Sequence, residues 1–153
     1  MKRISPHNLL PAGTRAVMAL HQAVHDGDLE PLLLELVYTR ASQINGCAFC
    51  LDMHTKDARA RGETEQRLYA LTAWRETNFY SDRECAALAL TEAVTRLTEE
   101  GVSDAVYDAA AAQFNDKELA ELIFAISAIN VWNRLNVTAR TVPGSYVSPH
   151  KPA

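Results

Sequence analysis

Long hydrophobic runs are missing from this sequence of 153 residues. No apolar stretch approaches the roughly 20 residues that a membrane-spanning helix needs. The first residues, MKRISPHNLLPAG, lack the apolar segment of a signal peptide. An excess of positive charge is missing too, because 15 Lys and Arg stand against 19 Asp and Glu. We therefore expect a cytoplasmic protein without a nucleic-acid or membrane partner.

Glycine, proline and cysteine are also scarce, with six, six and three residues. Three cysteines exclude a disulfide scaffold, and no alternating strand pattern of useful length occurs. The length predicts a single domain over 1–153, with a core at about 17–140, an extended N-terminal segment and a C-terminal tail. The fold class that we expect is all-α, a bundle of about six to seven helices.

Apolar periodicity and capping residues set the limits of the expected helices. Ser81 with Glu84 and Asn115 with Glu118 have the spacing of capping boxes. Asn45-Gly46, Gly62 and Gly101 are typical helix ends. We expect helices at 12–27, 31–45, 47–62, 65–76, 84–100, 103–114 and 118–136.

The most informative stretch is GCAFCLDMH, residues 46–54. On a helix the positions i, i+3 and i+7 share one face, so Cys47, Cys50 and His54 project together. The break at Asn45-Gly46 puts Cys47 near the helix start, where unpaired N–H groups and the helix dipole stabilise a thiolate. The motif therefore predicts redox-active cysteines.

Two neighbouring thiols can share the reduction of a peroxide. One thiolate becomes a sulfenic acid, and the other condenses with it to a disulfide before further oxidation. His54, one turn past Cys50, can accept the thiol proton and return it. Glu35 in LLLELVY is either a partly buried proton-transfer group or, with Thr39 and Ser42, part of a solvated stripe.

The sequence resembles the alkylhydroperoxidase D-like proteins of the carboxymuconolactone decarboxylase superfamily. The resemblance lies in Glu35, followed after eleven residues by Cys47-x-x-Cys50-x-x-x-His54, and in the surrounding stretch SQINGCAFCLDMHTKDARARG. The match covers residues 35–62 closely. The resemblance implies an all-α homo-oligomer, often a trimer or hexamer, that reduces hydroperoxides with electrons from a thiol or dithiol. It also implies that Cys50 attacks, Cys47 resolves, and His54 and Glu35 form a proton relay through water, with no cofactor or metal.

This sequence departs from some family members at Phe49, where they carry a His directly before the second cysteine. The substitution removes one polar group from the expected site.

Four alternatives stay open at this stage. Cys47, Cys50, His54 and Glu35 are acceptable zinc ligands, although ligands on consecutive turns of one helix cannot readily surround a tetrahedral ion. The same dithiol also suits a non-enzymatic redox sensor or a disulfide oxidoreductase. The decarboxylase branch of the superfamily works without a CxxC.

The remaining candidate residues receive structural interpretations. His21 and His25 are spaced for a metal but lack an HExxH glutamate, so we expect a surface pair. Cys85, in ECAALAL, is expected to be a small buried hydrophobic residue. We expect core or subunit contacts from Tyr38, Trp74, Phe124 and Trp132.

Overall fold

The computed structural model describes residues 3–150, and within them the chain is all-helical, without a β-strand. None of these helices is long and apolar enough to cross a membrane. The helices are α1 (Pro6–Leu9), α2 (Pro11–His25), α3 (Pro31–Asn45), α4 (Ala48–Ala60), α5 (Glu65–Ala70), the 3-10 helix η1 (Leu71–Glu76), α6 (Asp82–Thr95), α7 (Asp104–Ala111) and α8 (Asp116–Ala139).

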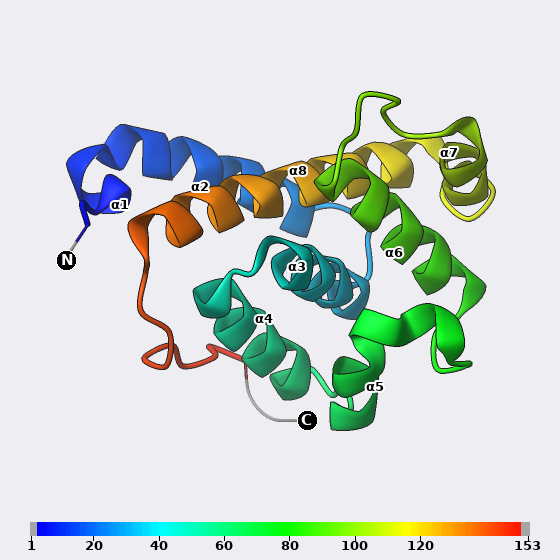
Figure 1. The fold of residues 1–153 in the computed structure, drawn as a ribbon, viewed down its shortest axis with the longest axis horizontal. Coiled ribbons are helices and arrows are strands. Elements are labelled where there is room, and N and C mark those ends of the chain that lie inside the picture. The colour runs from blue at the N-terminus through cyan, green and yellow to red at the C-terminus, as the bar shows by residue number, and fades with distance from the viewer. Residues whose placement is uncertain (1–2, 151–153) are drawn as a thin grey trace.

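Helix α3 lies at the centre, with α4, α6 and α8 packed around it (Figure 1). Its residues 33–42 are all buried, including the polar ones. A helix that is enclosed on every side carries apolar residues around its whole circumference, as LLLELVY does. Each fully buried leucine, such as Leu34 or Leu36, contributes about 1.5–3 kcal/mol to stability. Because α3 carries Glu35, this packing also draws a carboxylate into the core.

Most of the expected helix boundaries agree with the structure. Both capping boxes are confirmed: Ser81 and Asn115 accept hydrogen bonds from the backbone N–H of Glu84 and Glu118, and the two glutamates bond back. Gly46 ends α3 with φ of 65°, in the left-handed region that favours glycine. A Cβ there would meet no atom within 4 Å, so the backbone angle, not space, favours glycine at this position.

Three expectations about the helices need correction. The helix expected at 65–76 is two pieces, α5 and η1, with non-helical dihedral angles at Ala73. The helix expected to reach residue 100 ends at Thr95, where a turn with a bridge between Thr98 and Gly101 follows. Within the N-terminal segment expected to be extended, Pro6 begins the single turn α1, because proline suits the first position of a helix.

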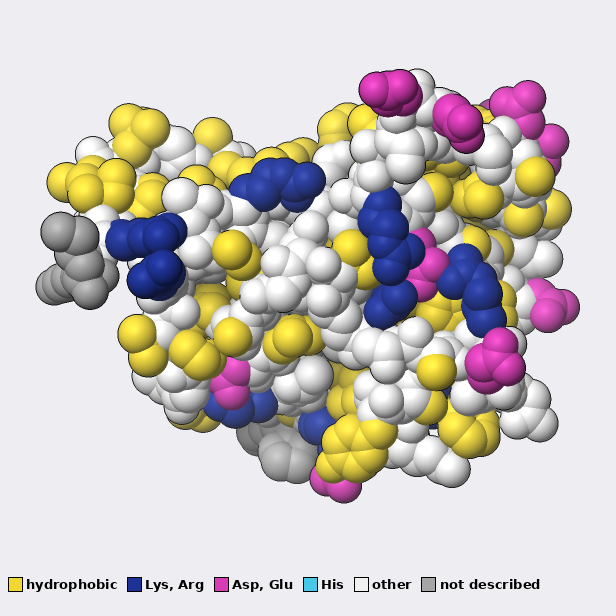
Figure 2. Space-filling view, in the orientation of Figure 1, with side chains coloured by type: hydrophobic (Ala, Val, Ile, Leu, Met, Phe, Trp, Pro, Cys, Tyr) yellow, Lys and Arg dark blue, Asp and Glu magenta, His cyan; other side chains and the backbone are white. Residues whose placement is uncertain are grey.

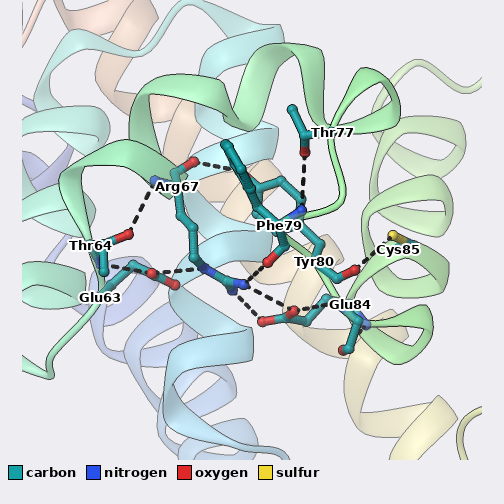
Figure 3. A network of polar contacts seen from close by, with 9 residues as sticks. Glu63, Thr64, Arg67, Thr77, Phe79, Tyr80, Glu84 and Cys85 are labelled. Carbon is teal, nitrogen blue, oxygen red and sulfur yellow. Dashed lines mark hydrogen bonds and ion pairs between the residues drawn. The ribbon is translucent and has the colours of Figure 1, made fainter.

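Arg67 connects α5 to the start of α6 (Figure 3). Its guanidinium group pairs with Glu63 at 2.9 Å and with Glu84, and its carbonyl oxygen accepts a hydrogen bond from the Tyr80 hydroxyl. Cys85 lies beside this network and donates its thiol hydrogen to the Tyr80 carbonyl at 3.8 Å. Cys85 is only half-buried, so the expectation of a buried residue was wrong.

Some hydrophobic side chains remain on the surface. Figure 2 shows one group of them over α1 and the start of α2, and others elsewhere on the same face. Phe124 on α8 is 56% exposed, whereas Tyr38 and Trp74 are buried in the core, and Trp132 is half-buried. The exposed apolar residues of α1, α2 and α8, together with Leu10 between α1 and α2, include Leu9, Met18, Ile123, Phe124, Val131 and Val137.

Candidate active site

The two cysteines of the motif stand at the start of α4. The left-handed turn at Gly46 leads into Cys47, the N-cap residue, whose backbone N–H donates to the Ser42 carbonyl at 3.0 Å. Cys47 and Cys50 form a disulfide, with their Cα atoms 5.3 Å apart. The prediction that Cys47 and Cys50 lie close together at the start of one helix is therefore confirmed.

Each cysteine sulfur has its own polar contact. The Cys47 sulfur accepts the backbone N–H of Cys50 at 3.3 Å, as an N-cap side chain does. The Cys50 sulfur accepts a hydrogen bond from Asn136 Nδ2 on α8 at 3.9 Å. Asn136 is held in turn, because its Oδ1 lies 3.3 Å from His7 Nε2. A donor faces each sulfur, and donors of this kind stabilise thiolates.

His54 and Glu35 meet directly in the interior. His54 Nδ1 lies 2.9 Å from Glu35 Oε2, and each residue is only 3% exposed. Thr39 and Ser42 are buried as well, so the solvated-stripe interpretation of Glu35 was wrong. Glu35, Thr39 and Ser42 are buried because α3 is enclosed on every side. Because His54 lies one turn after Cys50 on α4, the pair lies beside the cysteines.

The phenol ring of Tyr38 packs against the imidazole ring of His54, and the two ring centroids are 4.9 Å apart. His21 and His25 of α2 lie on the same tyrosine, at 5.3 and 5.9 Å. Both histidines are half-buried, so the expected surface pair was wrong. Burial, and then the Glu35 carboxylate, raise the pKa of Tyr38, so its phenol stays protonated. Burial, followed by the charges on His25 and His54, lowers the pKa of His21 to about 4.

The segment after α8 returns to cover α4. Tyr146 donates its hydroxyl to Asp57, with distances of 2.9 and 2.8 Å to the two carboxylate oxygens. Gly144 donates its N–H to Asp52, and Lys56 donates to the Tyr146 carbonyl. Arg61, whose Nε is 3.7 Å from Glu35 Oε1, contacts His150. The segment after α8 therefore lies along α4 (Figure 1).

Cys50 opens into a pocket of about 380 Å³, which we call the Cys50 pocket. The wall is largely apolar and comes from α1, α2, α4, α8 and the residue at 141. Its lining includes Met18, His21, Phe49, Met53, Trp132 and Asn136. Cys47 instead borders a separate hollow of about 150 Å³ near Arg140. The two hollows are neighbours, because both are lined by Phe49, Asn136 and Thr141.

Comparison with known proteins agrees with this geometry. Residues 11–93 match the carboxymuconolactone decarboxylase family. The uncharacterized protein YdfG of Bacillus subtilis strain 168 is 40% identical over 136 residues, which span 89% of this chain and 92% of YdfG. This chain belongs to the carboxymuconolactone decarboxylase family. Within that family it is an alkylhydroperoxidase D-like member, as the motif predicted.

Two solved structures of similar fold extend this comparison. A protein of unknown function from Agrobacterium tumefaciens, named provisionally as the antioxidant defence protein AhpD, has a TM-score of 0.90 and 39% identity over 95% of this chain and 100% of its own. The debrominase Bmp8 has a TM-score of 0.78 at 19% identity, over 90% of this chain and 74% of its own. The likeness to Bmp8 concerns the fold alone.

For this alkylhydroperoxidase D-like protein, the zinc alternative required both cysteines as ligands. Among residues 3–150, the group of side chains close enough to hold a metal is Glu35, His54 and Asp57, without either cysteine. The two sulfurs are bonded to each other. Glu35 already pairs with His54, and Asp57 accepts from Tyr146. The Cys–Cys–His–Glu set of the zinc alternative is therefore not assembled as one site.

The sequence analysis missed several residues around the site. Asn136 and Tyr146 come from segments 86 and 89 residues away from their partners Cys50 and Asp57, and no local pattern connects them. His21 was noticed by its spacing, but its place in the Cys50 pocket depends on how α2 packs. The usable sequence signal for a buried site residue was a charged residue within an apolar run, as Glu35 is in LLLELVY.

Proposed function

We propose that this protein is a thiol-dependent peroxidase that reduces hydroperoxides with the Cys47–Cys50 pair. The observation that carries the proposal is a CxxC disulfide whose second sulfur opens into an apolar pocket beside a buried Glu–His pair. A hydroperoxide can reach Cys50 through the Cys50 pocket, whereas Cys47 borders the smaller hollow. This difference supports Cys50 as the attacking residue.

The proposed reaction begins with loss of the Cys50 thiol proton to His54, which Glu35 orients through the 2.9 Å contact. The Cys50 thiolate attacks the terminal oxygen of the hydroperoxide. A sulfur–oxygen bond forms, the oxygen–oxygen bond breaks, and the departing alkoxide takes up the proton held by His54. The products of this step are a Cys50 sulfenic acid and an alcohol.

Cys47 then resolves the sulfenic acid. As the N-cap residue its sulfur accepts the Cys50 N–H, and this contact favours the thiolate that must attack. A disulfide forms, and the hydroxyl group leaves as water after protonation. A thiol or dithiol reductant returns the pair to the reduced state. Both cysteines are only 1% exposed, which favours a small or slender reductant over a bulky one.

Assembly into a homo-oligomer is a second part of the proposal. The exposed apolar residues of α1, α2 and α8 described above support it, because large apolar patches on a soluble chain mark interaction sites. A trimer or hexamer is the expected size.

The decisive experiment is a thiol count on fully reduced protein before and after one equivalent of tert-butyl hydroperoxide. We expect three thiols per chain to fall to one, with a Cys47–Cys50 disulfide in the peptide map. Cys85 should remain reduced, because burial and then the charges of Asp82 and Glu84 raise the pKa of its thiol. A Cys85→Ser control should fall from two thiols to none. An unchanged count, or oxidation mainly at Cys85, contradicts the proposal.

A further inference from the structure

His21 contributes a polar group to the wall of the Cys50 pocket. It lies on α2 and shares the wall with Phe49 and Cys50 of α4. Besides Cys50, α4 supplies Phe49 and Met53 to this wall, and neither side chain carries a hydrogen-bond donor. The imidazole of His21 therefore approaches the same space from another helix.

Two other polar side chains of this wall, those of Asn136 and Gln22, already have hydrogen-bond partners. Asn136 contacts the Cys50 sulfur, the Trp132 carbonyl and His7, and Gln22 donates to Asp26 at 2.8 Å. Within residues 3–150, the buried Nδ1 of His21 has no hydrogen-bond partner. Burying an unpaired N–H is costly, so the neutral ring is better protonated on Nε2, which leaves Nδ1 as a bare acceptor.

Electrostatics make His21 a neutral hydrogen-bonding group. Burial lowers its pKa to about 4, and the charges on His25 and His54 act in the same direction. When His54 is protonated, its charge further disfavours the protonated form of His21. A neutral imidazole has one N–H donor and one acceptor nitrogen. It can stabilise negative charge on an oxygen without first taking up a proton.

We propose that His21 is a catalytic residue that donates a hydrogen bond to the alkoxide oxygen as it leaves the hydroperoxide. The inference rests on the proposed peroxidase function. As the Cys50 sulfur bonds to the terminal oxygen, the oxygen–oxygen bond breaks and its electron pair stays on the alkoxide oxygen. The His21 N–H stabilises this charge until the proton from His54 arrives. A preorganised donor of this kind typically contributes about 10²–10³ in rate.

The test compares two oxidants with different leaving groups on fully reduced full-length protein. tert-Butyl hydroperoxide releases a strongly basic alkoxide, whereas peracetic acid releases a weakly basic carboxylate that needs little help. Rate constants for Cys50 oxidation are measured by quenched flow with thiol alkylation and mass spectrometry. We expect H21F to slow the reaction with tert-butyl hydroperoxide by about 10²–10³ and to leave the peracetic acid rate almost unchanged.

Two further variants sharpen the comparison. H21Q retains an N–H donor and should recover part of the lost rate with tert-butyl hydroperoxide. H25F is the matched control, since His25 packs on His21 and Tyr38 but does not line the Cys50 pocket, and both of its rates should match the wild type. If H21F does not fold, H21M, which fills similar space without an N–H, carries the same expectation.

Equal losses with both oxidants in H21F or H21M would mean that the pocket was damaged, and this result overturns the inference. No loss with either oxidant overturns it as well. Failure of the proposed function looks different, because wild-type protein itself would then leave its Cys47 and Cys50 thiols intact with tert-butyl hydroperoxide.

Discussion

Glu92 on α6 provides a quantitative test of the buried polar contacts that join α3, η1 and α6. Its carboxylate accepts hydrogen bonds from Arg40 at 2.8 Å, from the Trp74 indole at 3.0 Å and from Arg75. Burial alone raises the pKa of this carboxyl group, but the bonds from Arg75, Trp74 and Arg40 outweigh it and hold the pKa at about 2.

The magnitude follows from linkage between protonation and folding. The unperturbed value is 4.5, so the difference is about 2.5 pKa units, and one unit corresponds to about 1.36 kcal/mol. This gives an upper limit of about 3.4 kcal/mol. Arg75 and Arg96, the latter 3.4 Å from the Glu92 carboxylate, are about half exposed, so water screens their share, and we expect about 2 kcal/mol. Because the folded-state pKa is lowered, this stabilisation is full above pH 4.5 and disappears as the pH falls through 2.

The assay is chemical denaturation of wild type and Glu92→Gln at a series of pH values. At pH 7 the variant should be less stable by about 2 kcal/mol, and the difference should shrink steadily between about pH 5 and pH 2. Glu76→Gln is the control, because Glu76 is an exposed residue at the end of η1, and its stability should follow the wild type throughout. A wild-type to Glu92→Gln difference that is independent of pH, or absent at pH 7, refutes this reasoning.

The remaining predictions concern the site and the assembly. Cys50→Ser should abolish peroxide consumption, whereas Cys47→Ser should react once and stop as a sulfenic acid, visible by mass spectrometry after trapping; the reverse pattern means that the two roles are exchanged. Glu35→Gln and His54→Gln should each slow single-turnover oxidation by about 10²–10⁴ and require higher pH, because the thiol loses its proton acceptor; unchanged rates and pH profiles would exclude the relay. Sedimentation at micromolar concentration should show an oligomer, and a monomer would contradict the assembly proposal.

Helix positions were largely predictable because the signals are local. The capping boxes at Ser81 and Asn115 and the glycine at Gly46 act within a few residues, so the sequence contains all the information that they need. The break at Ala73 was not predictable in this way. LYALTAWRE has a helical pattern throughout, and the change to η1 comes with the packing of Leu71 and Trp74 against the core.

The site was predictable only in part. Helical spacing was enough to place Cys47, Cys50 and His54 on one face, and family likeness was needed to favour a buried Glu35 over a solvated one. The assignment of their catalytic roles stays a prediction. Asn136, Tyr146 and His21 reach the site through tertiary packing, and their side chains are common types in unremarkable surroundings. A pattern in one sequence cannot reveal such contacts.

The segment that covers α4 also has a consequence for how the protein is made. Translation at about 5–20 residues per second separates the appearance of Asp57 from that of its partner Tyr146 by roughly 4 to 18 s. At the start of this interval the nascent chain contains Cys47, Cys50, Glu35 and His54, but neither Asn136, which contacts Cys50, nor Tyr146. The two cysteines are therefore synthesised well before the segments that complete the fold around α4, and their thiols stay unmodified in the nascent chain only where the surroundings are reducing.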